Sequence, residues 1–328
     1  MSKEFQVVKT VSPIPDLAGK TKPRVLDLSE SQQKAVDEVL AHFDKPDYKL
    51  AVKGSQDANG TLTEDEKFWL TYECALRYLR ATKWHGSHHA IKRLEETLLW
   101  RREFGLYDER VSAENIEPEE VTGKQVLYGY DVDGRPSLYL CPSKQNTDES
   151  IRQVQHVVFM LERCIDVMGP GIESLVLMID YAEKSSKSPS FHTSRTVLHI
   201  LQTHYPERLG RALIIHMPWM LNAFFKLITP LIDPITKDKI RFNPKVVQDG
   251  LFTEDNVWKE FGGNIDFKYE HESYWPHFIE YTSERKRKLL ESWKALGGKV
   301  GLKEWDLKQR VASAEDSETK SQLSEVKT

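Results

Sequence analysis

Histidines and carboxylates that could bind a metal ion stand together near residue 271. His271 lies between Glu270 and Glu272, and His277 follows six residues later. Metal ligands must converge on one point, whereas the side chains of consecutive residues diverge in both helices and strands. We therefore interpret this segment as solvated polar residues and predict neither a metal site nor a cofactor.

A second histidine group, His85, His88 and His89, surrounds a predicted helix start. Imidazoles in such a place cap the helix or face solvent more often than they transfer protons. The sequence also lacks the common enzyme signatures, which are the G-x-x-x-x-G-K-[ST] phosphate loop, the G-x-S-x-G elbow, H-E-x-x-H and G-x-G-x-x-G. These observations favour a protein that is not an enzyme.

The composition of the 328-residue chain is ordinary for a soluble globular protein. Hydrophobic residues make up 39% and charged residues 29%, and 46 basic against 50 acidic side chains give a formal charge of -4. No overall basic field exists to neutralise phosphates, so we predict no nucleic-acid partner. The three cysteines, Cys74, Cys141 and Cys164, are odd in number and widely spaced, which indicates reduced thiols.

No segment approaches the roughly 20 apolar residues that a bilayer-spanning helix needs. The longest candidate without charge, 212–225, is interrupted by His216, Pro218 and Asn222. The N-terminus lacks the apolar segment of a signal peptide, and Ser2 stands where myristoylation requires glycine. We expect a cytoplasmic protein that contacts membranes only peripherally.

The first hundred residues are predicted to be mainly helical. Residues 1–28 contain several prolines and are expected to form an extended arm, and a helical module follows over 29–110. Capping boxes can start helices at Ser29 and Thr63, and a third helix begins near Ser87. No pattern in this module points to chemistry.

Strand and helix patterns alternate beyond residue 120. The turn Asp131-Val132-Asp133-Gly134 predicts a hairpin, and an unbroken apolar run over 175–179 suits a strand that is buried on both faces. Further strands are expected over 125–130, 137–140 and 211–216, and one more strand begins near residue 240. Helices are expected over 148–168 and 188–204. This alternation predicts the α/β class, with a mixed but mainly parallel sheet.

The sheet-containing domain is expected over 120–275, followed by a C-terminal helical segment over 276–305 and a disordered tail over 306–328. The helical segment carries four consecutive basic residues at 285–288. A solvated helix face is the favoured interpretation of this run, and docking on an anionic lipid leaflet is the alternative.

The segment after Pro218 is apolar on nearly every side of a helix. Its large apolar residues include Met220, Phe224, Phe225, Ile228 and Leu231. A helix of this kind needs burial or a lipid-like partner. It is either a central core helix or a mobile lid over an apolar cavity, hinged at breaks near Pro218, Pro230 and Pro234.

Four strings occur in a specific order over residues 63–263. They are Leu76-Arg77-Tyr78-Leu79-Arg80-Ala81-Thr82-Lys83-Trp84, Asp133-Gly134-Arg135-Pro136, Tyr205-Pro206-Glu207-Arg208-Leu209-Gly210 and Asp233-Pro234-Ile235-Thr236-Lys237-Asp238-Lys239-Ile240. Each string alone is weakly specific. The four strings in this order and spacing, across about 200 residues, are highly specific. Together they resemble the CRAL-TRIO lipid-binding family, and within it the fungal phosphatidylinositol transfer proteins.

The resemblance implies a helical N-terminal module packed on an α/β domain whose sheet forms the floor of a lipid cavity. The apolar helix over 218–231 would then be the gate of that cavity. The resemblance also implies that Glu207, Thr236 and Lys239 contact the inositol phosphate headgroup. An ammonium complements a phosphodiester, and carboxylate and hydroxyl groups bond to a polyol. Relatives often carry a basic pair where this sequence has Thr82-Lys83, so Lys83 is the one cation expected there.

Four leucines depart from the pattern of relatives that also carry phosphatidylcholine. Those relatives have a Ser-x-Thr pair on the buried strand and tyrosines in the hairpin, whereas this sequence has Leu175 and Leu177, and Leu127 and Leu138. A phosphocholine phosphate without hydrogen-bond partners would cost on the order of several kcal/mol. The resemblance therefore predicts phosphatidylinositol binding, poor phosphatidylcholine binding and a mostly hydrocarbon second ligand, for which a sterol is preferred.

The leading hypothesis is a non-enzymatic protein that exchanges or presents phosphatidylinositol. It would contact membranes transiently, with the endoplasmic reticulum or lipid droplets as candidate targets and a phosphoinositide kinase as a candidate partner. The pattern resembles the fungal branch linked to azole and drug resistance. A regulatory protein-interaction module on the same fold is the alternative. A lipid hydrolase is least favoured, because no nucleophile, base and oxyanion constellation is recognisable.

Overall fold

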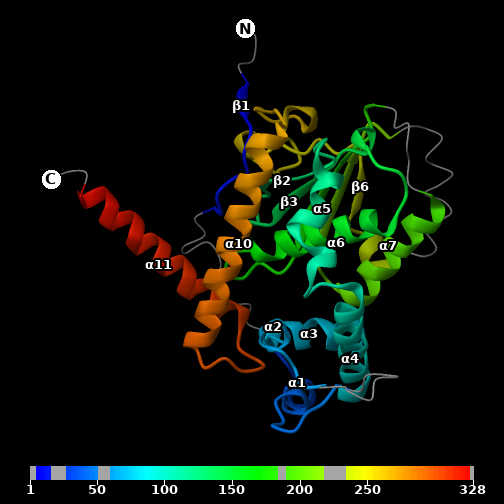
Figure 1. Cartoon of the computed structure of the whole chain (residues 1–328), viewed down its shortest axis with the longest axis vertical. Helices are drawn as coiled ribbons and strands as arrows, with labels where there is room; N and C mark the ends of the chain where they lie inside the picture. The colour runs from blue at the N-terminus through cyan, green and yellow to red at the C-terminus, as the bar shows by residue number, and fades with distance from the viewer. Residues whose placement is uncertain (1–4, 16–26, 51–59, 184–189, 218–233, 326–328) are drawn as a thin grey trace. The chain divides into compact units, whose positions relative to one another are not determined.

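The structure is a computed structural model that describes residues 5–15, 27–50, 60–183, 190–217 and 234–325. The chain divides into two compact units (Figure 1). The sheet unit comprises Met1–Pro15, Phe104–Met168 and Ile172–Ser283, and the helical unit comprises Asp16–Glu103, Gly169–Gly171 and Glu284–Thr328. The predicted boundary between residues 275 and 276 falls inside the continuous helix α10, His271–Ala295.

Four helices form the first part of the helical unit: α1 Glu30–Phe43, α2 Glu64–Trp69, α3 Tyr72–Ala81 and α4 Ser87–Phe104. Capping boxes start α1 at Ser29 and α2 at Thr63, which confirms both predictions. In each box the cap hydroxyl accepts the N3 amide, and the N3 side chain accepts the cap amide. The buried faces of these helices share one apolar core that includes Val36, Leu76 and Leu94.

The last helix, α11 Glu304–Glu325, occupies most of the tail that we expected to be disordered over 306–328. Glu304 anchors its start, since its carboxylate accepts a hydrogen bond from Arg77 at 2.7 Å. Leu307 and Val311, one helical turn apart, are 2% and 4% exposed. These contacts order the first turns of a segment whose composition is otherwise polar.

A five-stranded sheet in the order β2-β3-β4-β5-β6 forms the centre of the sheet unit. Its strands are β2 Gln125–Tyr130, β3 Pro136–Leu140, β4 Leu175–Asp180, β5 Leu209–Ile215 and β6 Ile240–Phe242. β2 and β3 form the predicted antiparallel hairpin, and β3 to β6 run parallel, which confirms the expected α/β fold. The parallel strands β3 to β6 all begin at one end of the sheet, which we call the amino edge. They all end at the opposite end, which we call the carboxyl edge.

Helices connect the strands of this sheet. They are α5 Ala113–Glu120 before β2, α6 Ile151–Asp166, α7 Phe191–His204 and the single turn α9 Pro234–Lys237 before β6, together with the 3-10 turns Glu109–Val111, Pro142–Lys144, Glu254–Asn256 and Lys259–Phe261. The sequence did not predict α5. The helix expected over 188–204 is α7, which begins at Phe191 with Ser190 as its N-cap, and residues 188 and 189 lie outside the described residues. In the arm, β1 Gln6–Val8 pairs in parallel with β7 Ile265–Phe267.

Different elements cover the two faces of the sheet. On one face, Gln125 of β2 lies 3.2 Å from the His156 ring of α6. On the other face, Tyr139 of β3 stacks on Trp258, with ring centroids 3.8 Å apart. The Tyr274 hydroxyl of α10 bonds to both backbone polar groups of Leu127, so it covers the edge strand β2.

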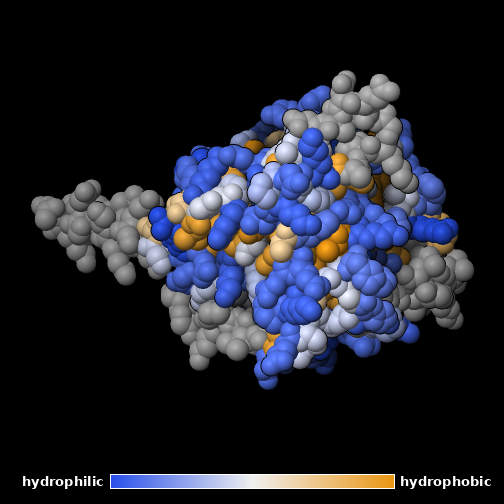
Figure 2. All heavy atoms as spheres, turned by 90° about the horizontal axis from the view of Figure 1, so that it is seen from below, coloured by the Kyte–Doolittle hydropathy of each residue, from blue (hydrophilic) through white to orange (hydrophobic). Residues whose placement is uncertain are grey.

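None of the described helices is long and apolar enough to cross a bilayer. The face of the molecule in Figure 2 is mostly hydrophilic, with apolar side chains in small separate spots.

Candidate functional site

The turn between α7 and β5 carries Glu207 at the amino edge. The neighbouring Arg208 is buried and donates to the Glu173 carbonyl at 2.9 Å, while the Arg208 carbonyl accepts from the Leu175 amide at 2.9 Å. These bonds tie the turn to the start of β4. Glu207 itself has a φ of 60°, a left-handed conformation that costs a non-glycine residue about 1 kcal/mol or more. The tied turn therefore fixes the direction in which the Glu207 side chain leaves the backbone.

Lys239, which precedes β6, lies beside the same turn. Its Nζ donates to the Leu209 carbonyl at 2.7 Å, and its own carbonyl accepts from the Ala212 amide at 2.9 Å. Thr236 belongs to α9, and the Thr236 carbonyl accepts from the Lys239 amide at 3.1 Å. The structure thus places Glu207, Thr236 and Lys239 at one edge of the sheet. A carboxylate, a hydroxyl and an ammonium at one edge suit a ligand that is both a polyol and a phosphate ester.

Lys83 is the fourth residue predicted for the headgroup site. It belongs to the helical unit, in the turn between α3 and α4, and its side chain is exposed. Its φ of 54° is left-handed, and its amide donates to the Arg80 carbonyl at 2.8 Å. The turn therefore has a defined conformation, and the contribution of Lys83 to the headgroup stays a prediction.

Four charged residues that the sequence analysis did not assign to the site also lie at the amino edge. Arg135 donates to Asp131 at 2.9 Å and to Asp133 at 2.6 Å, and Arg211 of β5 contacts the same two carboxylates. Burial opposes ionisation of Asp133, but both guanidinium groups outweigh it and keep the pKa of Asp133 below its usual range. The D-x-D-G-R string, which contains Asp131, Asp133 and Arg135, can be recognised in the sequence. The contacts of Arg211 with the two aspartates depend on the order of the strands in the sheet.

The predicted cavity leucines lie together on one face of the sheet. Leu127 pairs with Leu138, Leu138 pairs with Leu177, and Ala212 continues this row on β5. Paired residues point to the same face, and so does Leu175, two residues before Leu177 on β4. This is the face on which Gln125 meets α6. The four residues that replace polar groups of relatives thus form one continuous apolar surface.

Most of this apolar surface is buried: Leu127, Leu138 and Leu175 are 4%, 3% and 2% exposed, and Leu177 is the one of the four leucines that is partly exposed. β4 is the central strand of the sheet, yet Leu177 and Ile179 are only partly buried, whereas Val176 and Met178 on the opposite face are fully buried. Central strands of parallel sheets are normally covered on both faces. The apolar surface that a ligand could contact in the described structure therefore lies at Leu177 and Ile179. The predicted gate residues Met220, Phe224, Phe225, Ile228 and Leu231 lie outside the described residues.

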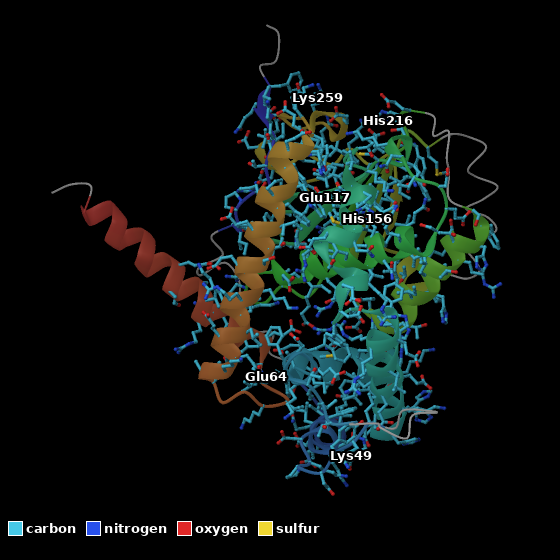
Figure 3. All side chains as sticks on the ribbon, viewed as in Figure 1. Lys49, Glu64, Glu117, His156, His216 and Lys259 are labelled. Atoms are coloured by element: carbon cyan, nitrogen blue, oxygen red, sulfur yellow. The ribbon has the colours of Figure 1, made fainter. Side chains whose placement is uncertain are left out.

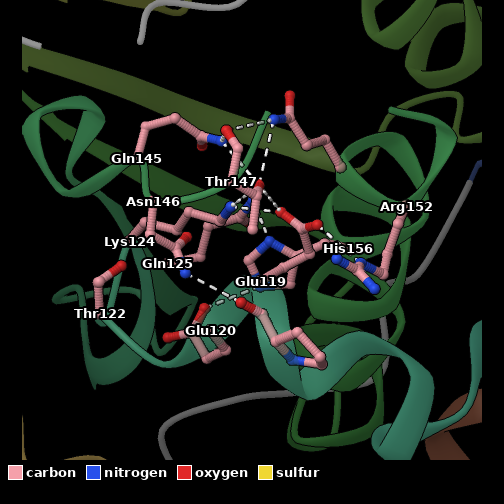
Figure 4. A network of polar contacts seen from close by, with 12 residues as sticks. Glu119, Glu120, Thr122, Lys124, Gln125, Gln145, Asn146, Thr147, Arg152 and His156 are labelled. Carbon is pink, nitrogen blue, oxygen red and sulfur yellow. Dashed lines mark hydrogen bonds and ion pairs between the residues drawn. The ribbon is translucent and has the colours of Figure 1, made fainter. Parts of the chain in front are cut away.

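A buried ionic network holds the loop after β3 at the carboxyl edge (Figure 4). Glu119 of α5 is fully buried and accepts from Lys124 at 2.5 Å, from Thr147 at 2.6 Å and from Arg152 at 2.9 Å. Burial raises the pKa of Glu119, but these donors outweigh burial and bring the pKa below its usual value. Glu119 is therefore a buried anion whose partners stabilise its charge.

The adjacent Glu120 has the opposite electrostatic character (Figure 4). It is fully buried, and its Oε2 lies 2.8 Å from Nε2 of His156, which is 1% exposed. Burial raises the pKa of Glu120 well above its usual value and lowers the pKa of His156 to about 3. Both shifts favour the uncharged forms of the two side chains.

The basic run over 285–288 of α10 is paired with acidic side chains of the helical unit. The pairs are Arg285 and Lys288 with Glu315, both at 3.1 Å, Arg287 with Glu284 at 2.6 Å and with Glu291, and Lys286 with Asp65 at 3.9 Å. The charge of this run is thus balanced within the unit. This balance favours a structural role over docking on an anionic leaflet.

His271 is not a solvated residue, contrary to our expectation. Its Nε2 lies 3.0 Å from the Glu117 carboxylate and its Nδ1 lies 3.0 Å from the Tyr269 hydroxyl, so it joins α10 to α5. Within the described ranges, no group of three or more His, Cys, Asp or Glu residues could hold a metal ion. None of the three cysteines forms a disulfide, and all three are buried.

The two parts of the chain match two family models. Residues 35–96 match the CRAL/TRIO N-terminal domain, and residues 120–263 match the CRAL/TRIO domain. The chain belongs to the CRAL-TRIO family.

Relatives within this family support the assignment. The chain is 37% identical to the phosphatidylinositol transfer protein PDR17 of Saccharomyces cerevisiae over 303 residues, which cover 87% of this chain and 86% of that protein. It is 47% identical to a CRAL-TRIO domain-containing protein of Schizosaccharomyces pombe over 298 residues, 90% of this chain but only 29% of that protein. The chain spans about half the length of some other relatives. Among solved structures, the crystal structure of Sfh5 covers 75% of this chain with a TM-score of 0.52 and 18% identity, which shows a shared fold.

Proposed function

We propose that this protein binds phosphatidylinositol and carries it between membranes. The proposal is carried by one observation: Lys239, through its bond to Leu209, lies beside the turn that presents Glu207. The 37% identity to a phosphatidylinositol transfer protein, along 86% of that relative, supports the same function. No catalytic step is part of the proposal.

The headgroup would be bound at the amino edge by side chains with separate tasks. The Lys239 ammonium donates to the Leu209 carbonyl, and its positive charge beside this turn would attract the phosphodiester. The Glu207 carboxylate and the Thr236 hydroxyl would bond to inositol hydroxyls. Charge-assisted bonds of this kind are roughly twice as strong as neutral ones, so the polar end of the lipid supplies most of the selectivity.

The leucine face would exclude phosphatidylcholine. Acyl chains leave one apolar environment for another, so their transfer from membrane to protein is nearly neutral. A phosphocholine phosphate placed against Leu138, Leu175 and Leu177 would lack hydrogen-bond donors at a cost of several kcal/mol, which corresponds to roughly a hundredfold preference or more. The same surface would accept a mostly hydrocarbon second ligand, and we propose a sterol.

The transfer cycle would begin with transient docking on a membrane. The segment over 218–231 would serve as the gate, the bound lipid would exchange, and the protein would leave with the new lipid. A phosphoinositide kinase is the proposed recipient when the lipid is presented rather than released.

Lipid extraction and a transfer assay test this function together. Mass spectrometry of lipid extracted from protein purified from its native host should find phosphatidylinositol. Exchange between vesicles should be rapid for labelled phosphatidylinositol and slow for labelled phosphatidylcholine. Protein that contains no phosphatidylinositol and does not move it would overturn the proposal, and rapid phosphatidylcholine exchange would refute the leucine argument.

A further inference from the structure

We propose that the carboxyl edge of the sheet is the surface that docks on a phospholipid bilayer, with Ile151, Phe191 and Phe242 inserting among the lipid headgroups. The proposal rests on the proposed function, because it concerns the membrane that supplies and receives the lipid.

Three large apolar side chains are exposed at this edge. Ile151 is the first residue of α6, Phe191 is the first residue of α7 and Phe242 is the last residue of β6. Their exposed fractions are 63%, 45% and 47%. The loops that lead to α6 and α7 leave the ends of β3 and β4, so the parallel topology gathers all three at one edge. Three large exposed apolar side chains at one end of the sheet, although not one continuous patch, favour an interaction surface there.

Polar contacts hold this edge in a defined arrangement. The Glu149 carboxylate accepts from the Ser190 hydroxyl at 2.5 Å and also from Thr193, so the starts of α6 and α7 lie side by side. Ile151 and Phe191 are one or two residues from these contacts. The His216 ring, labelled in Figure 3, lies 2.8 Å from Asp180 and links the ends of β5 and β4. Anchors held by such contacts insert with little loss of conformational entropy.

Exposed cations lie close in sequence to Phe191 and Phe242 and point to a lipid surface as the partner. Arg195 on α7, Arg241 on β6 and Lys245 beyond it are all exposed. Separate apolar side chains flanked by cations suit the headgroup layer, where rings enter the interface and cations meet lipid phosphates. The core of a protein interface is typically continuous and depleted in lysine. Acidic residues such as Asp148 and Glu183 are also exposed near this edge, and they oppose attraction to anionic lipids. We therefore expect insertion of the apolar side chains to contribute more to binding than electrostatic attraction.

The other candidate for a membrane surface, the basic run over 285–288, has its charge balanced by acidic partners within the helical unit. It also lacks an exposed large apolar residue among those that the structure describes. The carboxyl edge combines apolar anchors with exposed cations, so it is the better docking surface.

A fluorescent probe at a single introduced cysteine tests the docking surface in the full chain. The native cysteines are buried, and burial raises the pKa of Cys141 to about 12, so a thiol-reactive dye should label the introduced residue selectively. Ile151→Cys carries an environment-sensitive dye at the carboxyl edge. Val132→Cys is the matched control, because Val132 is 53% exposed in the hairpin turn at the amino edge. Vesicles of phosphatidylcholine and phosphatidylserine should brighten and blue-shift the dye at 151 but not at 132.

Binding affinity supplies a second measurement. Ile151→Ser, Phe191→Ser and Phe242→Ser together should weaken sedimentation with the same vesicles on the order of tenfold, and Val132→Ser should leave it unchanged. Equal dye responses at 151 and 132, or unchanged binding by the folded triple variant, would overturn the docking surface. Should the dye respond as expected while the purified protein holds no phosphatidylinositol, the docking surface stands and the proposed function fails.

Discussion

The Nζ atom of Lys239 lies 2.7 Å from the carbonyl oxygen of Leu209, two residues beyond Glu207 in the chain. This hydrogen bond links the residue before β6 to the first residue of β5. A lysine side chain normally loses about 2 kcal/mol of rotamer entropy when it is fixed. Because the Leu209 carbonyl already restrains this ammonium in the structure, part of that cost would be met before a phosphate binds.

Lys239→Ala should reduce phosphatidylinositol transfer at least about tenfold, because the phosphodiester would lose its cation. Lys237→Ala is the matched control, since Lys237 is exposed in the neighbouring turn α9 and should transfer normally. Thermal unfolding of both variants should resemble that of the parent. Normal transfer by Lys239→Ala would show that the site is assigned wrongly.

Glu207→Gly should separate function from stability. Glycine adopts a φ of 60° without the steric cost that glutamate bears, so the variant should be as stable as the parent or up to about 1 kcal/mol more stable. Transfer of phosphatidylinositol should nevertheless fall, because the carboxylate is lost. Urea unfolding and the exchange assay measure the two effects. A glycine variant that unfolds more easily and transfers normally contradicts both parts of the expectation.

Restoring polar groups on the leucine face should change lipid selectivity. Leu138→Tyr together with Leu177→Thr places two hydroxyls on neighbouring strands at paired positions. We expect phosphatidylcholine transfer to rise at least about tenfold, because each hydroxyl can bond to the phosphate, while phosphatidylinositol transfer stays near the parent level. Competition between the two labelled lipids measures the ratio. An unchanged ratio in a folded variant would argue against these leucines as the selectivity determinant.

Glu120→Gln and Glu119→Gln should change stability in opposite directions. The raised pKa of Glu120 means that the folded protein keeps a proton that the unfolded chain releases above about pH 4.5, so its contribution to stability falls as the pH rises. Glu120→Gln should therefore be more stable than the parent at pH 7, by an amount that grows by about 1.4 kcal/mol per pH unit up to the folded-state pKa.

Glu119→Gln should lose about 3–5 kcal/mol at pH 7, because Lys124 would keep a buried charge without its carboxylate. The lowered pKa of Glu119 makes this loss smaller as the pH falls through that pKa. Urea titrations at pH 4.5, 6 and 7.5 measure both neighbours. A destabilised Glu120→Gln at neutral pH would mean that Glu120 is ionised in the folded protein.

Removing one cation from the basic run of α10 should not affect membrane binding. Arg287→Gln removes an exposed cation that pairs with Glu284 and Glu291. We expect vesicle sedimentation to match the parent and stability to change by at most about 1 kcal/mol, as for other exposed ion pairs. Arg195→Gln at the carboxyl edge is the comparison, and it should weaken binding to phosphatidylserine vesicles modestly. Stronger loss in Arg287→Gln than in Arg195→Gln would move the docking surface to α10.

Local signals predicted most elements of the fold. The capping boxes at Ser29 and Thr63, the hairpin turn and the apolar run of β4 each act through neighbours in the chain, so sequence reveals them. The structure differs from the prediction at the start of α7, which is Phe191 and not 188, and in the tail over 306–328, most of which is the helix α11. The first residue of α11, Glu304, accepts a hydrogen bond from Arg77, which lies 227 residues earlier in the chain. No local sequence pattern can predict such a contact.

The identities of the site residues are a property of the sequence by itself: which carboxylate, hydroxyl and ammonium are available, and which polar positions of relatives have become leucine. Only the tertiary structure decided their neighbours. Strand register made one surface of Leu127, Leu138 and Leu177, and strand order brought Arg211 to Asp131 across 80 residues. The structure also gave adjacent glutamates opposite pKa shifts. The physical reason is that burial, pairing and electrostatic environment depend on groups far apart in the chain, which meet only when the chain is folded.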